Sequence, residues 1–442
     1  VAGVELSSTL SFDQPTPRAV ADHILELVGA LTSSSPVEGG FRAAAPQLTG
    51  GEIGVCSTSI KVAGGVDSSS GLGDILQGAG DAVHFVPATR FMPQADHCAQ
   101  GAFMTGVELF DNSFFGLAPA EADATDPQQR LLLEMGYAAL HGASQRRGTL
   151  MGRSVGVHAG VEHLDWQLLQ LIMTSKTALQ RVSAYAASGE QGHVASGRLG
   201  FVFDLQGPTM SINTACSSGL VAAHLSSGAL RGAECELGLS AAVKLVLLPF
   251  GEAETVLAPD GRSKSFDARG DGYGRSETAG VLVLALHEGS TPSLAGSAVR
   301  SGGRGASLTA PNGTGHVRTI SMALDAASIA ADEVGCVQGQ GLGSALADPI
   351  EVNALILALC KSRSSQLAIG AHKANVGHSE SPSGLIGCLT ALDVLQRRTA
   401  AANAQLRQLN LLLVQPSRRA AAPLAFPTSG LLSPGLDVCG VT

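Results

Sequence analysis

The sequence is poor in aromatic and charged residues, which narrows its partners before any motif is considered. Tryptophan occurs once and aromatic residues make up 4% of the chain, whereas the 442 residues include 55 glycines. A core of small aliphatic side chains with many close backbone approaches is typical of layered α/β folds. The net charge of −9 provides no basic footprint, so neither nucleic acid nor an anionic membrane is an expected partner.

Long apolar runs, a leader and paired cysteines are also missing. No apolar stretch reaches the roughly 20 residues needed to span a bilayer, and no basic segment precedes an apolar core at the amino terminus. The eight cysteines stand singly without a CxxC pair, so neither a zinc cage nor a disulfide framework is expected. We therefore expect a cytoplasmic protein without a membrane span. Because the chain looks like a fragment, organellar targeting could lie outside it.

Composition divides the chain into three segments. Residues 1–30 contain an amphipathic run from Ala19 to Val28 that follows Pro17, as expected of a short helix. Residues 31–52 are rich in Ser, Pro, Gly and Ala and are expected to form a flexible linker. Residues 53–442 contain no further linker, and we treat them as one domain.

Within residues 53–442, short apolar strands alternate with helical stretches, which predicts helices packed on largely parallel sheets. The expected strands are residues 53–56, 155–158, 211–213, 280–286 and 367–369. The expected helices are residues 128–140, 217–230, 319–331, 349–360 and 382–397.

Cys216 follows a β-prone run, Thr209–Ile212, and precedes an Ala- and Leu-rich helix. At such a corner, unpaired backbone amides and the helix dipole would stabilise a thiolate and could bind an oxyanion. The alternative is a structural cysteine buried among small residues. On spacing alone, the two interpretations are evenly matched.

Further motifs stand in a fixed order around Cys216. They are DPQQRLLLE at 126–134, ASGRL at 195–199, GPT at 207–209, TACSS at 214–218, DGRSKSFD at 260–267, DGYGRSE at 271–277, LTAPNG at 308–313, DPIE at 348–351 and KANVGHSE at 373–380. Together these motifs resemble the β-ketoacyl synthases over residues 53–442. DPQQR favours the modular polyketide synthases, and residues 1–30 resemble the end of an acyl carrier protein.

This resemblance implies a thiolase-like α/β/α/β/α layered fold of two similar halves and a homodimer. It also implies that Cys216 accepts an acyl chain from the phosphopantetheine of an acyl carrier protein. A malonyl-type extender is then decarboxylated, and its carbanion attacks the acyl-cysteine. The phosphopantetheine arrives on the carrier, so no metal, nucleotide or redox cofactor is implied for this domain.

The family's remaining roles fall on three residues by position. His378 would bind the extender's thioester oxygen, Lys373 would set the local electrostatics, and Glu380 would orient that network. Taken alone, these would be a satisfied polar side chain, a surface charge and a helix acid. Other polar residues receive structural roles. Ser217 and Ser218 are expected to pack and cap the helix after Cys216, Asp348 and Glu351 to cap and start a helix, and Asp126 and Arg130 to tie the fold together.

One position departs from the family. A second histidine, which normally precedes DPIE, is replaced by Gln340, and glutamine cannot titrate near neutral pH. General acid–base help is worth ~10²–10⁴-fold, so condensation should be severely weakened while loading of Cys216 survives. Ketosynthases lacking this histidine form a non-elongating class. His372, on the opposite face of a strand from Lys373, and His316, in a loop, are not expected to substitute.

Several other interpretations remain beside this one. The chain ends before the family's glycine-rich loop, so we expect a truncated domain. A fully active elongating synthase is one alternative, and a scaffold like a chain-length factor is another, although such scaffolds typically lose the cysteine. A cysteine hydrolase, a thiolase and a dinucleotide-binding site at residues 339–343 fit the motifs less well.

Overall fold

The computed structural model describes the following residues: 21, 24, 25, 51–92, 99–162, 165–174, 185–249, 256–287, 292–303, 311–361, 363–420, 423–432 and 437–442. The chain divides into two compact units, residues 1–45 and 46–442, and the second contains the sheets of the fold. The carrier-like segment 1–30 and the linker 31–52 lie almost wholly outside the described residues. Both therefore stay predictions.

A six-stranded sheet has the order β5-β4-β6-β7-β1-β8. Its strands are β1 (Glu52–Val62), β4 (Val155–Val161), β5 (Thr209–Ile212), β6 (Leu237–Lys244), β7 (Thr278–His287) and β8 (Ser293–Leu294). Strands β5, β4 and β6 are parallel, but the remaining neighbours are antiparallel, so our prediction of largely parallel sheets is wrong here. Lys244 pairs with Thr278 because the connection after β6 returns to the same end of the sheet. The pattern of apolar residues does not show the direction in which the chain re-enters the sheet.

A second, four-stranded sheet is parallel throughout and has the order β12-β10-β9-β14. Its strands are β9 (Cys336–Gln338), β10 (Leu367–Gly370), β12 (Leu424–Ala425) and β14 (Cys439–Val441). Two short pairs complete the strands: β2 (His84–Phe85) with β3 (Gln100–Gly101), and β11 (Thr399–Ala400) with β13 (Leu431–Leu432).

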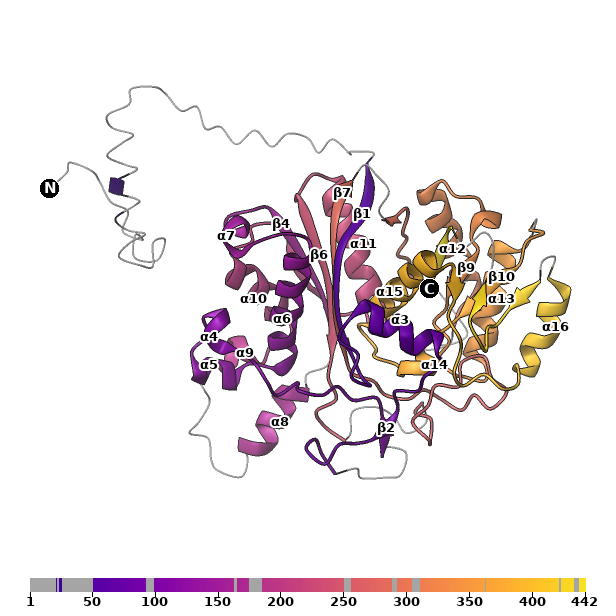
Figure 1. Cartoon of the computed structure of the whole chain (residues 1–442), viewed down its shortest axis with the longest axis horizontal. Helices are drawn as coiled ribbons and strands as arrows, with labels where there is room; N and C mark the ends of the chain where they lie inside the picture. Colours follow the sequence, from indigo (N-terminus) through magenta and orange to yellow (C-terminus); the bar gives the residue numbers. More distant parts are fainter. Residues whose placement is uncertain are drawn as a thin grey trace, which may run out of the picture. The chain divides into compact units, whose positions relative to one another are not determined.

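Helices form three layers around these sheets (Figure 1). Helices α6 (Pro127–Gly142) and α10 (Val194–Phe203) pack on the outer face of the larger sheet. Helices α11 (Ser218–Arg231) and α15 (Ser383–Arg397) lie between the two sheets. The outer face of the smaller sheet is covered by α13 (Ala347–Leu359), on which α12 (Gly313–Ala327) and α16 (Leu411–Arg419) pack. This arrangement confirms the predicted α/β/α/β/α layering.

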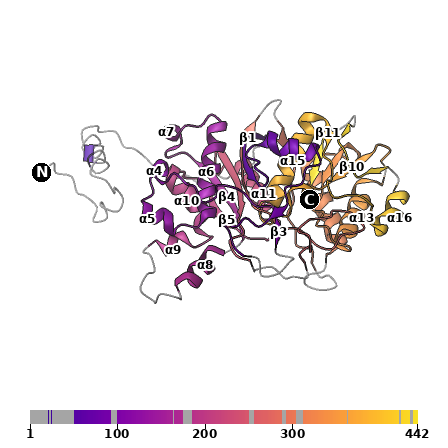
Figure 2. The same cartoon turned by 60° about the horizontal axis from the view of Figure 1, so that its bottom comes forward.

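The shorter helices lie at the edges of these layers. They are α3 (Ser69–Gln77), α4 (Asn112–Phe115), α5 (Pro119–Ala124), α7 (Arg147–Leu150), α8 (Asp165–Thr174), α9 (Ala186–Gly189), the 3-10 helix η2 (Ala331–Glu333) and α14 (Lys373–Val376). In the turned view of Figure 2, β5 lies beside β4 at the edge of the larger sheet. Among the described residues, no helix has the length and apolar character to cross a membrane.

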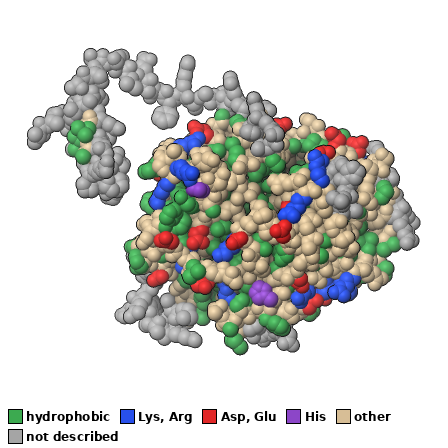
Figure 3. Space-filling model, viewed as in Figure 1, with side chains coloured by type: hydrophobic (Ala, Val, Ile, Leu, Met, Phe, Trp, Pro, Cys, Tyr) green, Lys and Arg blue, Asp and Glu red, His purple; other side chains and the backbone are tan. Residues whose placement is uncertain are grey.

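Two histidines lie on elements other than those predicted. His316 is on α12 and not in a loop, because Asn312 caps that helix by accepting a hydrogen bond from the Gly315 amide. His372 is the N-cap residue of α14 and not part of a strand, since β10 ends at Gly370. On the face shown in Figure 3, acidic and basic side chains are interspersed.

Candidate active site

Cys216 lies at the predicted corner between β5 and α11. The preceding residue, Ala215, has a φ of 52°, a left-handed conformation that costs a non-glycine residue about 1–2 kcal/mol. The Ser218 hydroxyl stabilises this turn because it accepts a hydrogen bond from the Thr214 amide at 2.9 Å and donates one to the Ala215 carbonyl at 2.6 Å. The elbow is therefore closed by its own neighbours in sequence.

The amino end of α11 provides fewer donors than predicted. The amide of Ser217 donates to Thr214, that of Ser218 donates to Ala215, and that of Gly219 donates to Ser381. The backbone amide of Cys216 itself favours the thiolate. Ser217 is the N-cap residue, but its hydroxyl bonds to Thr214 and makes no capping hydrogen bond, so only Ser218 has the expected bracing role.

The environment of Cys216 favours a protonated thiol overall. Burial raises its pKa, while the charge of Lys373 and a hydrogen bond from the Gln340 side chain lower it. Burial is the largest of these effects, so the net direction is upward, which is opposite to the shift expected from the helix end alone. A nucleophilic thiolate here needs a proton acceptor nearby.

The charge of Lys373 acts on this thiol. It is the first residue of α14 and is 1% exposed, so it is not a surface charge. Burial lowers the pKa of Lys373 to about 8, while the nearby charges of Glu351, Cys216 and Asp348 act to raise it. A lysine with a pKa near 8 can take up and release a proton close to neutral pH.

His378 is buried and neutral. Burial and the charge of Lys373 lower its pKa to about 3, against the effect of Glu380. Its backbone is fixed by hydrogen bonds to Gly274 and Ser276, and the Tyr273 ring meets the imidazole edge-on with centroids 4.9 Å apart. Among the described residues, no hydrogen-bond partner reaches His378 Nδ1. A neutral imidazole can donate a hydrogen bond to a substrate oxygen.

Glu380 pairs with a residue that the sequence analysis did not single out. Its Oε2 lies 2.6 Å from Nζ of Lys244, the last residue of β6. The sequence signal was a lysine that follows the mostly apolar run 237–243, all of which is buried. Such a side chain must find a counter-charge, although the pattern does not say which one.

Gln340 follows β9, and its backbone is held from behind by Glu351. The Glu351 carboxylate accepts hydrogen bonds from the amides of Gln340 at 2.6 Å and Gly341 at 2.9 Å, and from the Thr442 hydroxyl at 2.6 Å. The Gln340 side chain contacts Cys216 by the hydrogen bond described above. Gln340, at the position where the resemblance leads us to expect a histidine, therefore lies beside Cys216.

Asp348 completes this support, so our assignment of Asp348 and Glu351 to helix capping is wrong. The N-cap residue of α13 is Leu346, and Asp348 lies inside the first turn. Its carboxylate accepts hydrogen bonds from the amides of Phe266, Gly343 and Ser344. Both acids thus hold the loop that carries Gln340, a contact that requires the tertiary fold.

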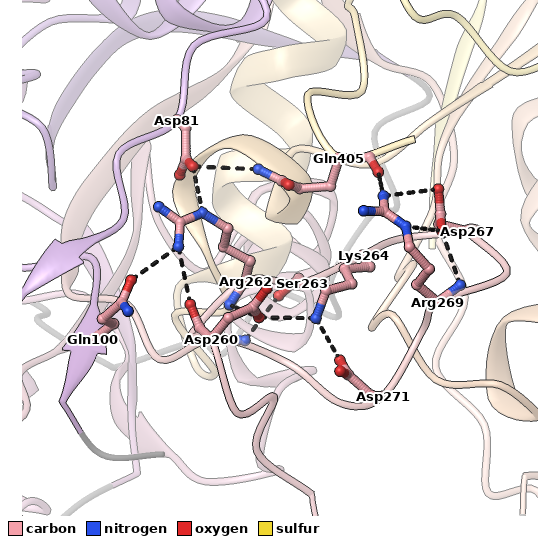
Figure 4. A network of polar contacts seen from close by, with 11 residues as sticks. Asp81, Gln100, Asp260, Arg262, Ser263, Lys264, Asp267, Arg269, Asp271 and Gln405 are labelled. Carbon is pink, nitrogen blue, oxygen red and sulfur yellow. Dashed lines mark hydrogen bonds and ion pairs between the residues drawn. The ribbon is translucent and has the colours of Figure 1, made fainter. Parts of the chain in front are cut away.

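The DGRSKSFD segment also supports this loop, through a network of polar contacts around Lys264 that Figure 4 shows. Lys264 bridges Asp260 and Asp271 at 2.8 and 2.7 Å. These ion pairs fix a turn whose Gly272 amide donates to the Gly343 carbonyl at 3.1 Å. The LTAPNG motif occupies residues 308–313, and its first part, up to residue 310, lies outside the described residues.

His372 lies near the site, whereas His316 lies on the exposed surface of α12. Burial, Lys373 and His378 lower the pKa of His372 well below its usual range, so this ring stays neutral although it lies near the site. The strand argument against His372 is therefore wrong, because α14 replaces that strand. His316 is exposed on α12. No group of three or more potential metal ligands is assembled within the described part of the chain.

Asp126 and Arg130 occupy structural positions. Asp126 is the N-cap residue of α6, and its side chain accepts a hydrogen bond from the Gln128 amide at 2.8 Å. Arg130 lies over the Trp166 ring, with 5.9 Å from its guanidinium carbon to the ring centroid.

Comparisons with known families cover most of the chain. The model for "Beta-ketoacyl synthase, N-terminal domain" matches residues 51–289, and that for "Beta-ketoacyl synthase, C-terminal domain" matches residues 292–407. Polyketide synthase GfsA of Streptomyces halstedii is 36% identical over 90% of this chain, and mycoketide-CoA synthase of Mycobacterium tuberculosis is 37% identical over 88%. The chain spans only 6% and 10% of the lengths of these two proteins.

Solved structures agree with these matches. A ketosynthase from module 6 of the bacillaene synthase of Bacillus subtilis superposes with a TM-score of 0.76 at 26% identity, covering 86% of this chain and 67% of that one. The oxazolomycin ketosynthase domain OzmH KS7 of Streptomyces albus superposes with a TM-score of 0.78 at 24% identity, covering 86% and 69%. The fold is that of the thiolase-like ketosynthases.

Proposed function

Because the chain belongs to the β-ketoacyl synthase family, we propose that its site moves an acyl chain from a carrier phosphopantetheine onto Cys216 and is impaired in the condensation that normally follows. The observation that carries this proposal is Gln340, whose side chain bonds to Cys216 where the family is expected to have a histidine. An amide can polarise a carbonyl or support a thiolate, but it cannot gain or lose a proton in this pH range.

The acyl transfer balances with groups of this chain. Lys373 takes the proton from the Cys216 thiol, and the resulting thiolate attacks the thioester carbonyl of the acyl-carrier. The carbon–sulfur bond to phosphopantetheine then breaks, and the leaving thiolate recovers the proton from Lys373. Because the pKa of Lys373 is about 8, the neutral amine that this step requires becomes more abundant as the pH rises towards 8.

Condensation requires the site to stabilise a negative charge on the extender. Loss of CO₂ from a malonyl-type extender leaves negative charge on its thioester oxygen, which needs donors or a positive group. His378 is neutral and provides one donor, while Gln340 provides an uncharged amide in place of a second imidazole. A fully elongating synthase and a non-catalytic scaffold remain the alternatives.

Intact-protein mass spectrometry tests the proposal. The wild type is incubated with acyl-carrier and then malonyl-carrier, beside Cys216→Ala and Gln340→His. We expect an acyl adduct on the wild type but not on Cys216→Ala, and β-ketoacyl product only with Gln340→His. Condensation by the wild type would contradict the role given to Gln340. No adduct at all would favour the scaffold.

We further propose that the domain works as a homodimer joined at the β5 edge. β5 is an outer strand of the larger sheet, and an unpaired strand edge invites pairing. Met210 on β5 and Phe201 on the neighbouring α10 are 43% and 86% exposed, and exposed apolar side chains beside a strand edge suit an interface. Light scattering on the wild type and Phe201→Asp measures the mass, and a monomeric wild type would contradict the homodimer.

A further inference from the structure

A second buried lysine, Lys244, lies beside the site and has no part in the chemistry described so far. Its side chain is 3% exposed, and its ion-pair partner Glu380 is 9% exposed. Removing two charges from water is costly, and their attraction compensates only when the geometry is very good. Well-packed hydrophobic pairs of similar volume are often at least as stabilising, so stability alone is a weak reason for this ion pair.

The ion pair fixes a strained segment. Glu380 has a φ of 51°, a left-handed conformation that persists in a non-glycine residue only where its surroundings enforce it. The next residue, Ser381, donates from its hydroxyl to the Val243 carbonyl at 2.8 Å, directly before Lys244. The 380–381 backbone is therefore tied to the end of β6 by one hydrogen bond and one ion pair.

The same segment contacts the nucleophile's helix. The Ser381 carbonyl accepts a hydrogen bond from the Gly219 amide at 3.0 Å, in the first turn of α11. An added Cβ at Gly219 would lie 2.8 Å from that carbonyl oxygen, so the two backbones are in close contact. Movement of the segment after His378 would consequently disturb the elbow that carries Cys216.

The charge of Lys244 also acts on the pKa of His378. Four titratable groups influence His378: Lys373 and Lys244 lower its pKa, Glu380 raises it, and His372 lies close enough that His378 lowers its pKa in turn. Lys244 also lowers the pKa of the buried Glu277. Lys244 therefore acts on His378 through its charge and on Glu380 through direct contact.

We propose that Lys244 is a positioning residue of the acyl-transfer site: it holds the Glu380 side chain in place, so that the segment from His378 to Ser381 keeps its contact with the helix behind Cys216. This role rests on the proposed acyl transfer. The fold of the segment, in contrast, can be tested without substrate.

Single-turnover acylation of Cys216 measures the proposed role through two separate quantities. The amplitude reports the fraction of competent protein, and the rate constant reports how well the site is arranged. For Lys244→Met we expect a rate constant about tenfold lower, equivalent to ~1.4 kcal/mol, at unchanged amplitude. Lys244→Arg, which keeps the charge, should restore most of the rate.

Two further variants distinguish an effect on the arrangement of the site from an effect on the stability of the fold. Lys244→Met with Glu380→Gln removes both charges of the ion pair, so no buried carboxylate has lost its lysine; the melting temperature should recover while the rate constant stays low. Arg153→Met is the matched control, because it breaks an ion pair of the same 2.6 Å length at the surface, with Glu236. We expect Arg153→Met to acylate like the wild type.

Hydrogen exchange of residues 377–383 keeps the test independent of activity. We expect faster exchange there in Lys244→Met and none of this change in Arg153→Met. Unchanged exchange, a wild-type rate constant, a loss of amplitude alone, or recovery of both rate and melting temperature in the double variant would overturn the proposal. If the wild type is never acylated, the proposed function fails, and the exchange measurement still decides the role of Lys244.

Discussion

The two sheets present their site residues in the same way but support them differently. Cys216 and Lys244 follow or end the parallel strands β5 and β6 of the larger sheet, while Gln340 and Lys373 follow β9 and β10 of the smaller one. Sites in α/β folds commonly lie beyond the carboxyl ends of parallel strands. Here one site is assembled from the strand ends of two sheets.

The residues that hold Cys216 and Gln340 in place lie at different distances along the chain. The Cys216 elbow is closed by Ser218, two residues away. The Gln340 loop is held by Glu351, 11 residues on, and by contacts with the distant turn around Gly272. Local closure can be recognised in a motif, whereas long-range support requires the fold.

Loss of Glu351 should have the largest effect. Glu351→Ala leaves the amides of Gln340 and Gly341 without their acceptor, and each buried unpaired group costs about 1–3 kcal/mol. We expect the free energy of unfolding to fall by about 3 kcal/mol and Cys216 acylation to fall more than tenfold, measured by denaturant melts and intact mass. Glu333→Ala removes an exposed carboxylate–amide contact, to Ala330, and should change neither quantity. If Glu351→Ala and Glu333→Ala changed stability and acylation equally, the burial of the Glu351 contacts would not matter.

The charge of Lys373 should set the pH dependence of acylation. Below its pKa of about 8 both Lys373 and the Cys216 thiol hold their protons, so the thiolate is scarce and the acylation rate should rise with pH towards 8–9. Lys373→Met removes a charge that lowers the pKa of Cys216, so the rise should shift to higher pH. Initial rates from pH 6 to 10 measure both profiles. A variant profile identical to that of the wild type would rule out this coupling.

Loss of the local closure should have the smallest effect. Ser218→Ala removes one acceptor and one donor at the elbow, and we expect a loss of about 1–2 kcal/mol in the free energy of unfolding with slower acylation. Ser227→Ala on the same helix is the control, because its buried hydroxyl bonds only to the Ala223 carbonyl within the helix. If both variants acylate at the same rate, the elbow does not depend on Ser218.

Most of the fold and part of the site could be predicted from the sequence. The five predicted helices form with shifted ends, and the strand around residues 211–213 leads into Cys216 as expected. These elements depend on apolar periodicity and on turn residues close in sequence. The antiparallel half of the larger sheet could not be predicted, because strand direction is set by where the connection from Lys244 to Thr278 returns.

The electrostatics of the site were the least predictable part. Position in a motif identified Cys216, His378 and Lys373 as candidates, but not the direction of the pKa of Cys216, where burial outweighs the helix end. It also missed Lys244, whose partner is 136 residues away.

The sequence by itself determined the five predicted helices and the corner that presents Cys216, because these depend on local pattern, while the layer order followed from the resemblance to the β-ketoacyl synthases. Only the tertiary structure decided which carboxylates face which cations: Glu351 against the Gln340 loop, and Glu380 against Lys244. The physical reason is that burial raises the cost of every unpaired charge, so the partners are chosen by packing and not by distance along the chain.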